Sequence, residues 1–178
     1  MSTKIKIADF IKSIADMTLE VSVIGNGETG SKKSIEEAGQ LKLEGSNITE
    51  ILVAEIFASQ IPLSKFLNSK DRNNLMDLYF LEIYHLVLNE YKYFKSKEEL
   101  VIFEKLIQVR FQEYYKILND SKTDTFVALG GEIAKSLIYK EPMWPLFPMT
   151  FGMILSSKMV GINDFIKESS EKFEVEFN

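Results

Sequence analysis

The polar residues best placed for chemistry are a glutamate and a histidine three positions apart, Glu82 and His85. Residues at this spacing share one face of a helix, so both could bind one metal ion, as the Glu-x-x-His pairs of di-iron helical bundles do. Such a site needs a second pair, and the chain contains a single histidine. We therefore expect His85 to be a hydrogen-bonded residue in or near the core, with no metal and no cofactor.

Two long helices must carry these residues. Apolar residues crowd the stretch over about 69–94, which predicts a helix that is buried on most sides. The run Ser96-Lys97-Glu98-Glu99 has the pattern of a capping box and predicts the start of a second helix, over about 97–118. The short turn between them indicates an antiparallel helical hairpin at the centre of the fold.

In that hairpin, residue 82 lies opposite residue 110. Arg110 falls on the apolar stripe of its helix, where an unpaired charge is costly. We expect a mostly buried ion pair between Glu82 and Arg110, with His85 one turn away and Tyr114 within reach. A buried polar cluster of this kind is more often structural than catalytic, because ion-pair networks also perturb pKa values.

Other kinds of reactive centre find little support. The chain has no cysteine, which excludes disulfides, thiolate nucleophiles and Cys-ligated zinc. No serine or threonine has an evident base beside it, so a hydrolase triad is not expected. Gly25, Gly27 and Gly30 fit G-x-G-x-x-G, but no alternation of strands and helices follows, and Ser31 replaces the lysine of a P-loop. We expect a mobile turn at 25–30 and no bound nucleotide.

A segment rich in methionine, aromatic residues and proline follows near the C-terminal end. Pro142, Pro145 and Pro148 prevent a regular helix across it. Methionines and aromatic residues are enriched at recognition surfaces. The alternative is that the segment only covers the core. The candidate interaction surface comprises Met143, Trp144, Phe147, Met149, Phe151 and Met153.

The rest of the chain also has mainly helical periodicity. It predicts helices over about 5–17, from 34, over 47–60 up to Pro62, over 126–139 with a close-packing or kink point at Gly130-Gly131, and over 151–159 up to Gly161. Alternating residues predict short strands at 19–23 and 173–177, which would pair the two terminal arms.

Length and composition set the class. A chain of 178 residues with 46 % apolar residues forms one all-α domain of six to eight helices, with 1–45 as an appendage to a helical core over 46–178. The net charge of −5 and the scattered lysines disfavour nucleic acid. No apolar run reaches about 18 residues, so no membrane span is expected. No signal peptide is evident, and the expected location is the cytoplasm.

Two functions remain after these exclusions. The first is a non-enzymatic interaction protein (an adaptor, inhibitor, immunity-type or regulatory protein) that offers an apolar helical surface to a protein partner or to a homo-oligomer. The alternative is an enzyme or small-molecule binder with a polar pocket around Glu82, His85 and Arg110.

Overall fold

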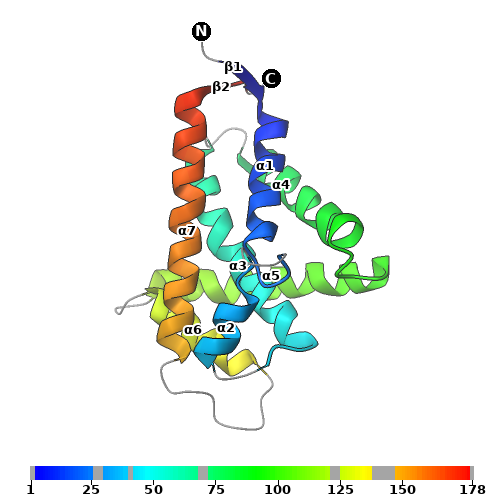
Figure 1. Cartoon of the computed structure of the whole chain (residues 1–178), viewed down its shortest axis with the longest axis vertical. Coiled ribbons are helices and arrows are strands. Elements are labelled where there is room, and N and C mark those ends of the chain that lie inside the picture. Colours follow the sequence, from blue (N-terminus) through cyan, green and yellow to red (C-terminus); the bar gives the residue numbers. More distant parts are fainter. Residues whose placement is uncertain are drawn as a thin grey trace.

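The computed structural model describes residues 3–25, 30–39, 42–67, 72–120, 125–137 and 147–176. Helices make up nearly all of this part of the chain, which confirms an all-α single-domain fold (Figure 1). The elements in chain order are β1 (Thr3–Lys6), α1 (Ile7–Glu20), α2 (Lys32–Gly39), α3 (Ser46–Phe66), α4 (Arg72–His85), the π-helix η1 (Leu86–Glu90), α5 (Lys97–Asp120), α6 (Thr125–Ser136), α7 (Phe147–Lys172) and β2 (Phe173–Glu176).

Helix α3 forms the centre of the core. Every residue from 51 to 60 is buried, and α1, α5, α6 and α7 pack around the helix. It also continues past Pro62 to Phe66, beyond the end that the sequence predicted. The central position expected for residues 69–94 is therefore wrong, because only Tyr79 and Ile83 are fully buried in α4.

Helix α1 belongs to the same core. Phe10, Ile11, Ile14 and Ala15 are buried in one cluster with the residues of α3, so the N-terminal part is not an appendage. The strand predicted at 19–23 is also wrong. The helix runs on to Glu20 and ends in a turn, in which the Ser22 N–H donates to the carbonyl oxygen of Leu19.

The two described strands join the ends of the chain. β1 and β2 pair in parallel, with Thr3 opposite Phe173 and Lys6 opposite Glu176. Lys4 Nζ adds an ion pair at 2.6 Å to Glu176 Oε1. Both strands continue directly from the ends of long helices, α1 and α7, that meet at one end of the molecule (Figure 1). Terminal pairing is confirmed, although its N-terminal strand is 3–6 rather than 19–23.

Helices α6 and α7 approach each other through glycine. A Cβ on Gly130 would lie 2.1 Å from the carbonyl oxygen of Pro148, and one on Gly152 would lie 2.4 Å from that of Phe126. Both positions therefore need hydrogen as the side chain. The expected close contact at Gly130 is confirmed, whereas α7 runs through Gly161 without the predicted break.

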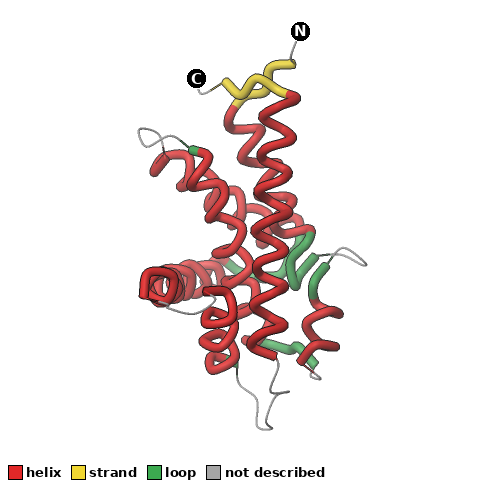
Figure 2. Tube along the Cα trace, turned by 90° about the vertical axis from the view of Figure 1, so that its left-hand side faces the viewer, coloured by secondary structure: helices red, strands yellow, loops and turns green. Residues whose placement is uncertain are grey.

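The predicted hairpin is present as α4 and α5, at one side of the molecule. Phe80 contacts Phe111 with ring centroids 5.8 Å apart, and Tyr84 contacts Phe103 at 6.4 Å. Later residues of α4 therefore contact earlier residues of α5, so the two helices are antiparallel. Figure 2 shows α5 nearly end-on at the edge of the fold, away from α1 and α7.

Candidate functional site

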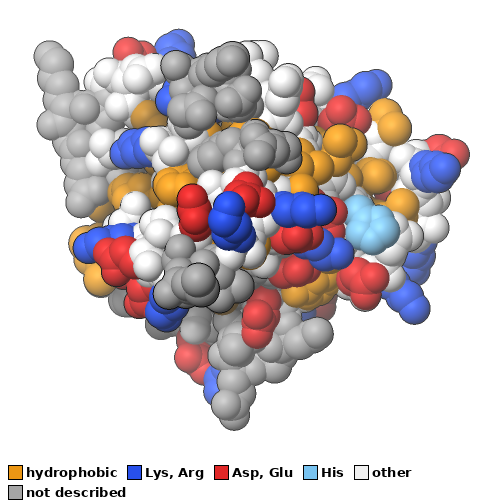
Figure 3. All heavy atoms as spheres, turned by 90° about the horizontal axis from the view of Figure 1, so that it is seen from above, with side chains coloured by type: hydrophobic (Ala, Val, Ile, Leu, Met, Phe, Trp, Pro, Cys, Tyr) orange, Lys and Arg blue, Asp and Glu red, His pale blue; other side chains and the backbone are white. Residues whose placement is uncertain are grey.

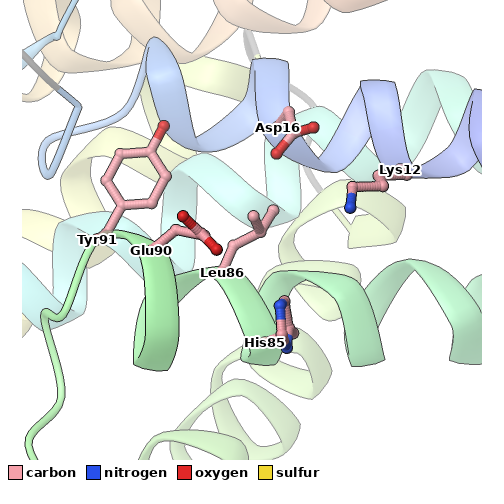
Figure 4. Close-up of a pocket in the computed structure, with 6 residues that line it drawn as sticks. All are labelled: Lys12, Asp16, His85, Leu86, Glu90 and Tyr91. Carbon is pink, nitrogen blue, oxygen red and sulfur yellow. The ribbon is translucent and has the colours of Figure 1, made fainter.

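A polar cleft of about 460 Å³ lies between α1 and the end of α4. Its lining residues are Lys12, Asp16, His85, Leu86, Glu90 and Tyr91. Figure 4 shows the α1 side chains projecting toward the helix end that carries Leu86 and Glu90. Two elements that are far apart in the sequence therefore form this site, which we call the π-helix cleft.

The π-helix supplies Leu86 and Glu90 to one side of this cleft. The N–H of Tyr91 donates to the carbonyl oxygen of Leu86 at 2.9 Å, five residues back, which widens the turn. Lys92 then takes a left-handed conformation, with φ of 52°, and ends the helix. Short π-helical turns occur often at functional sites, so this wall marks the cleft as a candidate.

Acidic groups outnumber basic ones around the cleft. Lys12 Nζ lies 3.5 Å from Glu82 Oε1 and forms an ion pair with it. This oxygen accepts no hydrogen bond from any described residue. Burial raises the pKa of Asp16, and although Lys12 opposes this effect, Glu82 and Glu90 add to it. The cleft therefore disfavours a further negative charge.

The histidine contributes a polar edge. His85 is exposed, and Asn89 Nδ2 lies 3.0 Å from its Nδ1, so the amide donates in the tautomer whose Nδ1 carries no proton. Figure 3 shows the histidine of the chain at the surface beside acidic and basic groups. A core position is therefore wrong for His85. No described residues form a group of three or more His, Asp or Glu arranged to hold a metal ion.

The predicted ion pair between Glu82 and Arg110 is wrong. Arg110 donates from Nε and Nη2 to the two carboxylate oxygens of Glu50, at 2.8 Å each, and from Nη1 to Glu113 at 2.7 Å. These hydrogen bonds raise the pKa of Arg110. Residues 82 and 110 lie on facing helices, but Glu82 faces α1 and Arg110 faces α3. Periodicity predicted the hairpin, and it could not say which neighbours cover its two sides.

Tyr114 is buried as expected, without joining a polar cluster that includes His85. Its ring contacts Phe57 of α3 at a centroid distance of 5.2 Å, and its hydroxyl has no hydrogen-bond partner among the described residues. Burial raises its pKa. Of the four predicted residues, only His85 lines the π-helix cleft, and Glu82 forms an ion pair with Lys12 of that lining.

Sequence reasoning missed a second polar cluster, which forms around a fully buried carboxylate. Glu55 of α3 is fully buried and lies 3.2 Å from Lys158 Nζ of α7. Its carboxylate also accepts the hydroxyl of Ser31 at 2.5 Å and the N–H of Val23 at 2.7 Å. Lys158 donates in addition to the carbonyl oxygen of Val21. The available signal was a single carboxylate inside the apolar run of α3, which needs a partner when buried.

Gly25 of the glycine motif ends the turn that follows α1. Glu55 and Lys158 hydrogen-bond to Val23 and Val21 of the same turn. The N–H of Gly25 donates to the carbonyl oxygen of Ser22 at 2.9 Å. A Cβ on Gly25 would lie 1.9 Å from the carbonyl oxygen of Glu20, and one on Gly30 would lie 2.6 Å from that of Gly25. Close backbone approach explains these two glycines, while Gly27 lies outside the described residues. The absence of nucleotide binding stays a prediction.

The structure divides the candidate interaction surface. Phe147 and Phe151 are fully buried and stack with ring centroids 5.6 Å apart, so these two residues belong to the core and not to an exposed surface. Met149 and Met153 are 44 % and 62 % exposed. The remaining two residues, Met143 and Trp144, lie outside the described residues.

Comparisons with protein-family models, with curated proteins and with solved structures found no match to this chain. Among the described residues, no helix is both long enough and apolar enough to cross a membrane.

Proposed function

We propose that this chain is a protein-interaction protein, in the manner of an adaptor, inhibitor, immunity-type or regulatory protein, and that it presents an apolar helical surface to its partner. One observation carries the proposal. Met149, Met153 and Val160, which are 44 %, 62 % and 50 % exposed, follow one another along α7. Spacings of four and seven residues place them in one row on the helix.

The surroundings of this α7 row favour binding. Phe147 and Phe151 anchor the same helix in the core, and Gly152 holds it against α6. The row is therefore fixed before a partner arrives, which lowers the entropy lost on association. Methionine side chains adapt to irregular surfaces, so two of them in one row suit a protein partner.

The test is native mass spectrometry of the chain purified from its own cells. We expect a retained protein, and we expect Met153→Glu to abolish its retention, because a carboxylate would be buried against apolar groups. Ser170→Glu is the matched control, since it adds the same charge to an exposed position of α7. A chain that retains no protein, or a partner that Met153→Glu leaves bound, would contradict the proposal.

A second candidate function is binding of a small polar molecule in the π-helix cleft, and the π-helical wall is the observation that favours it. Because the chain has one histidine, the Hε1 ring proton of His85 gives a single signal in NMR spectra. We expect this signal to shift during a screen of small amines, and Asp16→Asn to weaken the response. An unchanged signal across the screen would remove this candidate.

A further inference from the structure

A groove of about 400 Å³ runs between α4 and α5 on the face away from the core. Its lining residues are Asp77, Phe80, Leu81 and Tyr84 of α4, and Glu104, Ile107, Gln108 and Phe111 of α5. Leu81 is 63 % exposed, and the three aromatic rings are half-buried. The α4–α5 groove thus offers apolar surface that no other described element covers.

Each wall of the groove carries one carboxylate, Asp77 on α4 and Glu104 on α5. Neither forms an ion pair with another described residue. The negative field of Glu104 also contributes to the raised pKa of Tyr84 beside it. An occupant that combines apolar side chains with lysine or arginine would match this lining.

The form of the occupant follows from the backbone of the walls. Both walls are helices, whose N–H and C=O groups already bond within each helix, so the groove has no free edge to which a strand could add. Shallow grooves between helices instead accept an amphipathic helix, read through residues at spacings of three, four and seven. The occupant should therefore be a helix with apolar and basic residues on one face.

The chain itself carries such a face, on the outward side of α5. Val101, Lys105, Val109 and Lys116 are all exposed and follow one another at spacings of four, four and seven residues. These spacings place them on one side of the helix. We call this set the outer face of α5. The set combines two apolar groups with two cations and lies next to the groove on the same helix, and its spacings also place the exposed Gln112 and Glu98 on this side.

We propose that two copies of this chain associate with α5 of each copy in the α4–α5 groove of the other. Lys105 and Lys116 of one copy then lie toward Asp77 and Glu104 of the second, while the valines cover Leu81. Because groove and outer face are neighbours on one helix, a two-fold axis satisfies both contacts at once and closes the assembly as a dimer.

This inference rests on the proposed use of exposed apolar helix faces for binding, and it assigns one of those faces. The α7 row takes no part in the dimer, so it stays free for a different protein. Two copies would present two such rows, which strengthens the binding of a partner that can reach both.

The first experiment is sedimentation of the purified chain over a range of concentrations. We expect a reversible dimer of about 41 kDa, twice the 20.4 kDa chain. Leu81→Glu should weaken dimerisation at least about tenfold, because it buries a charge in the interface. Leu81 is exposed, so the variant should keep its helical circular dichroism, and this spectrum checks that it folds.

Charge exchange gives the sharper experiment. Asp77→Lys with Glu104→Lys makes groove and outer face both basic, whereas Lys105→Glu with Lys116→Glu makes both acidic. Each double variant alone should be monomeric. Mixed together, they should form a heterodimer in which both contacts again join opposite charges. Asp164→Lys with Glu171→Lys is the matched control, since it makes the same charge change at exposed positions of α7 and should leave the dimer intact.

Three results would overturn the inference. They are a chain that stays monomeric at about 100 μM, a dimer that is indifferent to the double variants, and growth into larger species instead of a closed dimer. None of them bears on the retained partner of the α7 row, whose test uses Met153→Glu. The two proposals therefore fail separately.

Discussion

Helix α3 holds one charge pair with α7 and another with α5 of the hairpin, and the two pairs lie in opposite surroundings. Glu55 and Lys158 lie inside the protein, where water does not reach the carboxylate. Arg110 and Glu50 lie at the margin of the hairpin and keep part of their side chains in solvent. Burial makes the first pair indispensable once formed, because removing one partner strands the other.

The same contrast extends to the apolar residues of the two regions. The side chains of α3 are nearly all used inside the fold, whereas the hairpin leaves Leu81, Val101 and Val109 in solvent. A region whose apolar side chains are buried in the core stabilises the fold. A region whose apolar side chains stay exposed can bind a partner through them. We therefore expect mutations in the first region to change stability and mutations in the second to change association.

The largest expected effect is the loss of the buried pair. Glu55→Gln or Lys158→Met should lower the free energy of unfolding by about 3–5 kcal/mol. The first variant leaves the ammonium of Lys158 without its counter-charge, and the second leaves the buried carboxylate of Glu55 without one. Glu50→Gln, the matched change where α3 meets the hairpin, should cost only about 1–2 kcal/mol, since Glu113 and solvent remain for Arg110. Urea denaturation measures all three. Equal losses in the two regions would contradict the contrast.

A smaller effect should follow from adding one methyl group between α6 and α7. Gly130→Ala should cost about 1–3 kcal/mol, because its Cβ would meet backbone rather than a movable side chain. Gly131→Ala is the neighbouring control. Its Cβ meets nothing within 4 Å, so alanine should stabilise the helix by up to about 1 kcal/mol. Thermal unfolding of both variants decides the matter, and the same sign for the two changes would show that this contact is not tight.

The smallest effect concerns the hairpin and depends on pH. Burial, with a contribution from Glu104, raises the pKa of Tyr84 to about 12, above the ordinary value of about 10. The unfolded chain therefore loses this proton first, and the stability that Tyr84 contributes below pH 10 is lost as the pH rises toward 12.

Glu104→Gln should lower the pKa of Tyr84 by less than about one unit, because burial is the larger cause. Absorbance of the tyrosinate, compared with and without Tyr84→Phe, gives the value. A pKa that Glu104→Gln leaves unchanged would place this carboxylate too far from the groove wall to matter.

Local patterns predicted the helices well, since periodicity and capping depend on residues close in sequence. The start of α5 after Ser96 is an example, because the Glu99 N–H bonds to the Ser96 hydroxyl three residues earlier. Patterns did not reveal which helix lies at the centre. Apolar crowding in α4 looked like burial on all sides, yet it serves partly to line a groove.

The candidate site was harder to predict, because partners of charged residues come from distant elements. Nothing near Arg110 in sequence points to Glu50, and nothing near Glu55 points to Lys158. Both pairs exist because α3 passes between α5 and α7, which is a property of the whole fold. A charge within an apolar helix signals that a partner exists, and only the tertiary structure identifies it.

The parallel pairing of β1 with β2 has a mechanical consequence. The chain enters β1 at Thr3 and leaves β2 at Glu176, at opposite ends of the ladder. A force that pulls on the chain before Thr3 and after Glu176 therefore slides one strand along the other. All hydrogen bonds of the ladder share that load at once, instead of opening one by one. The short sheet therefore bears this force in shear, and its two strands must separate before the tension reaches α1 and α7.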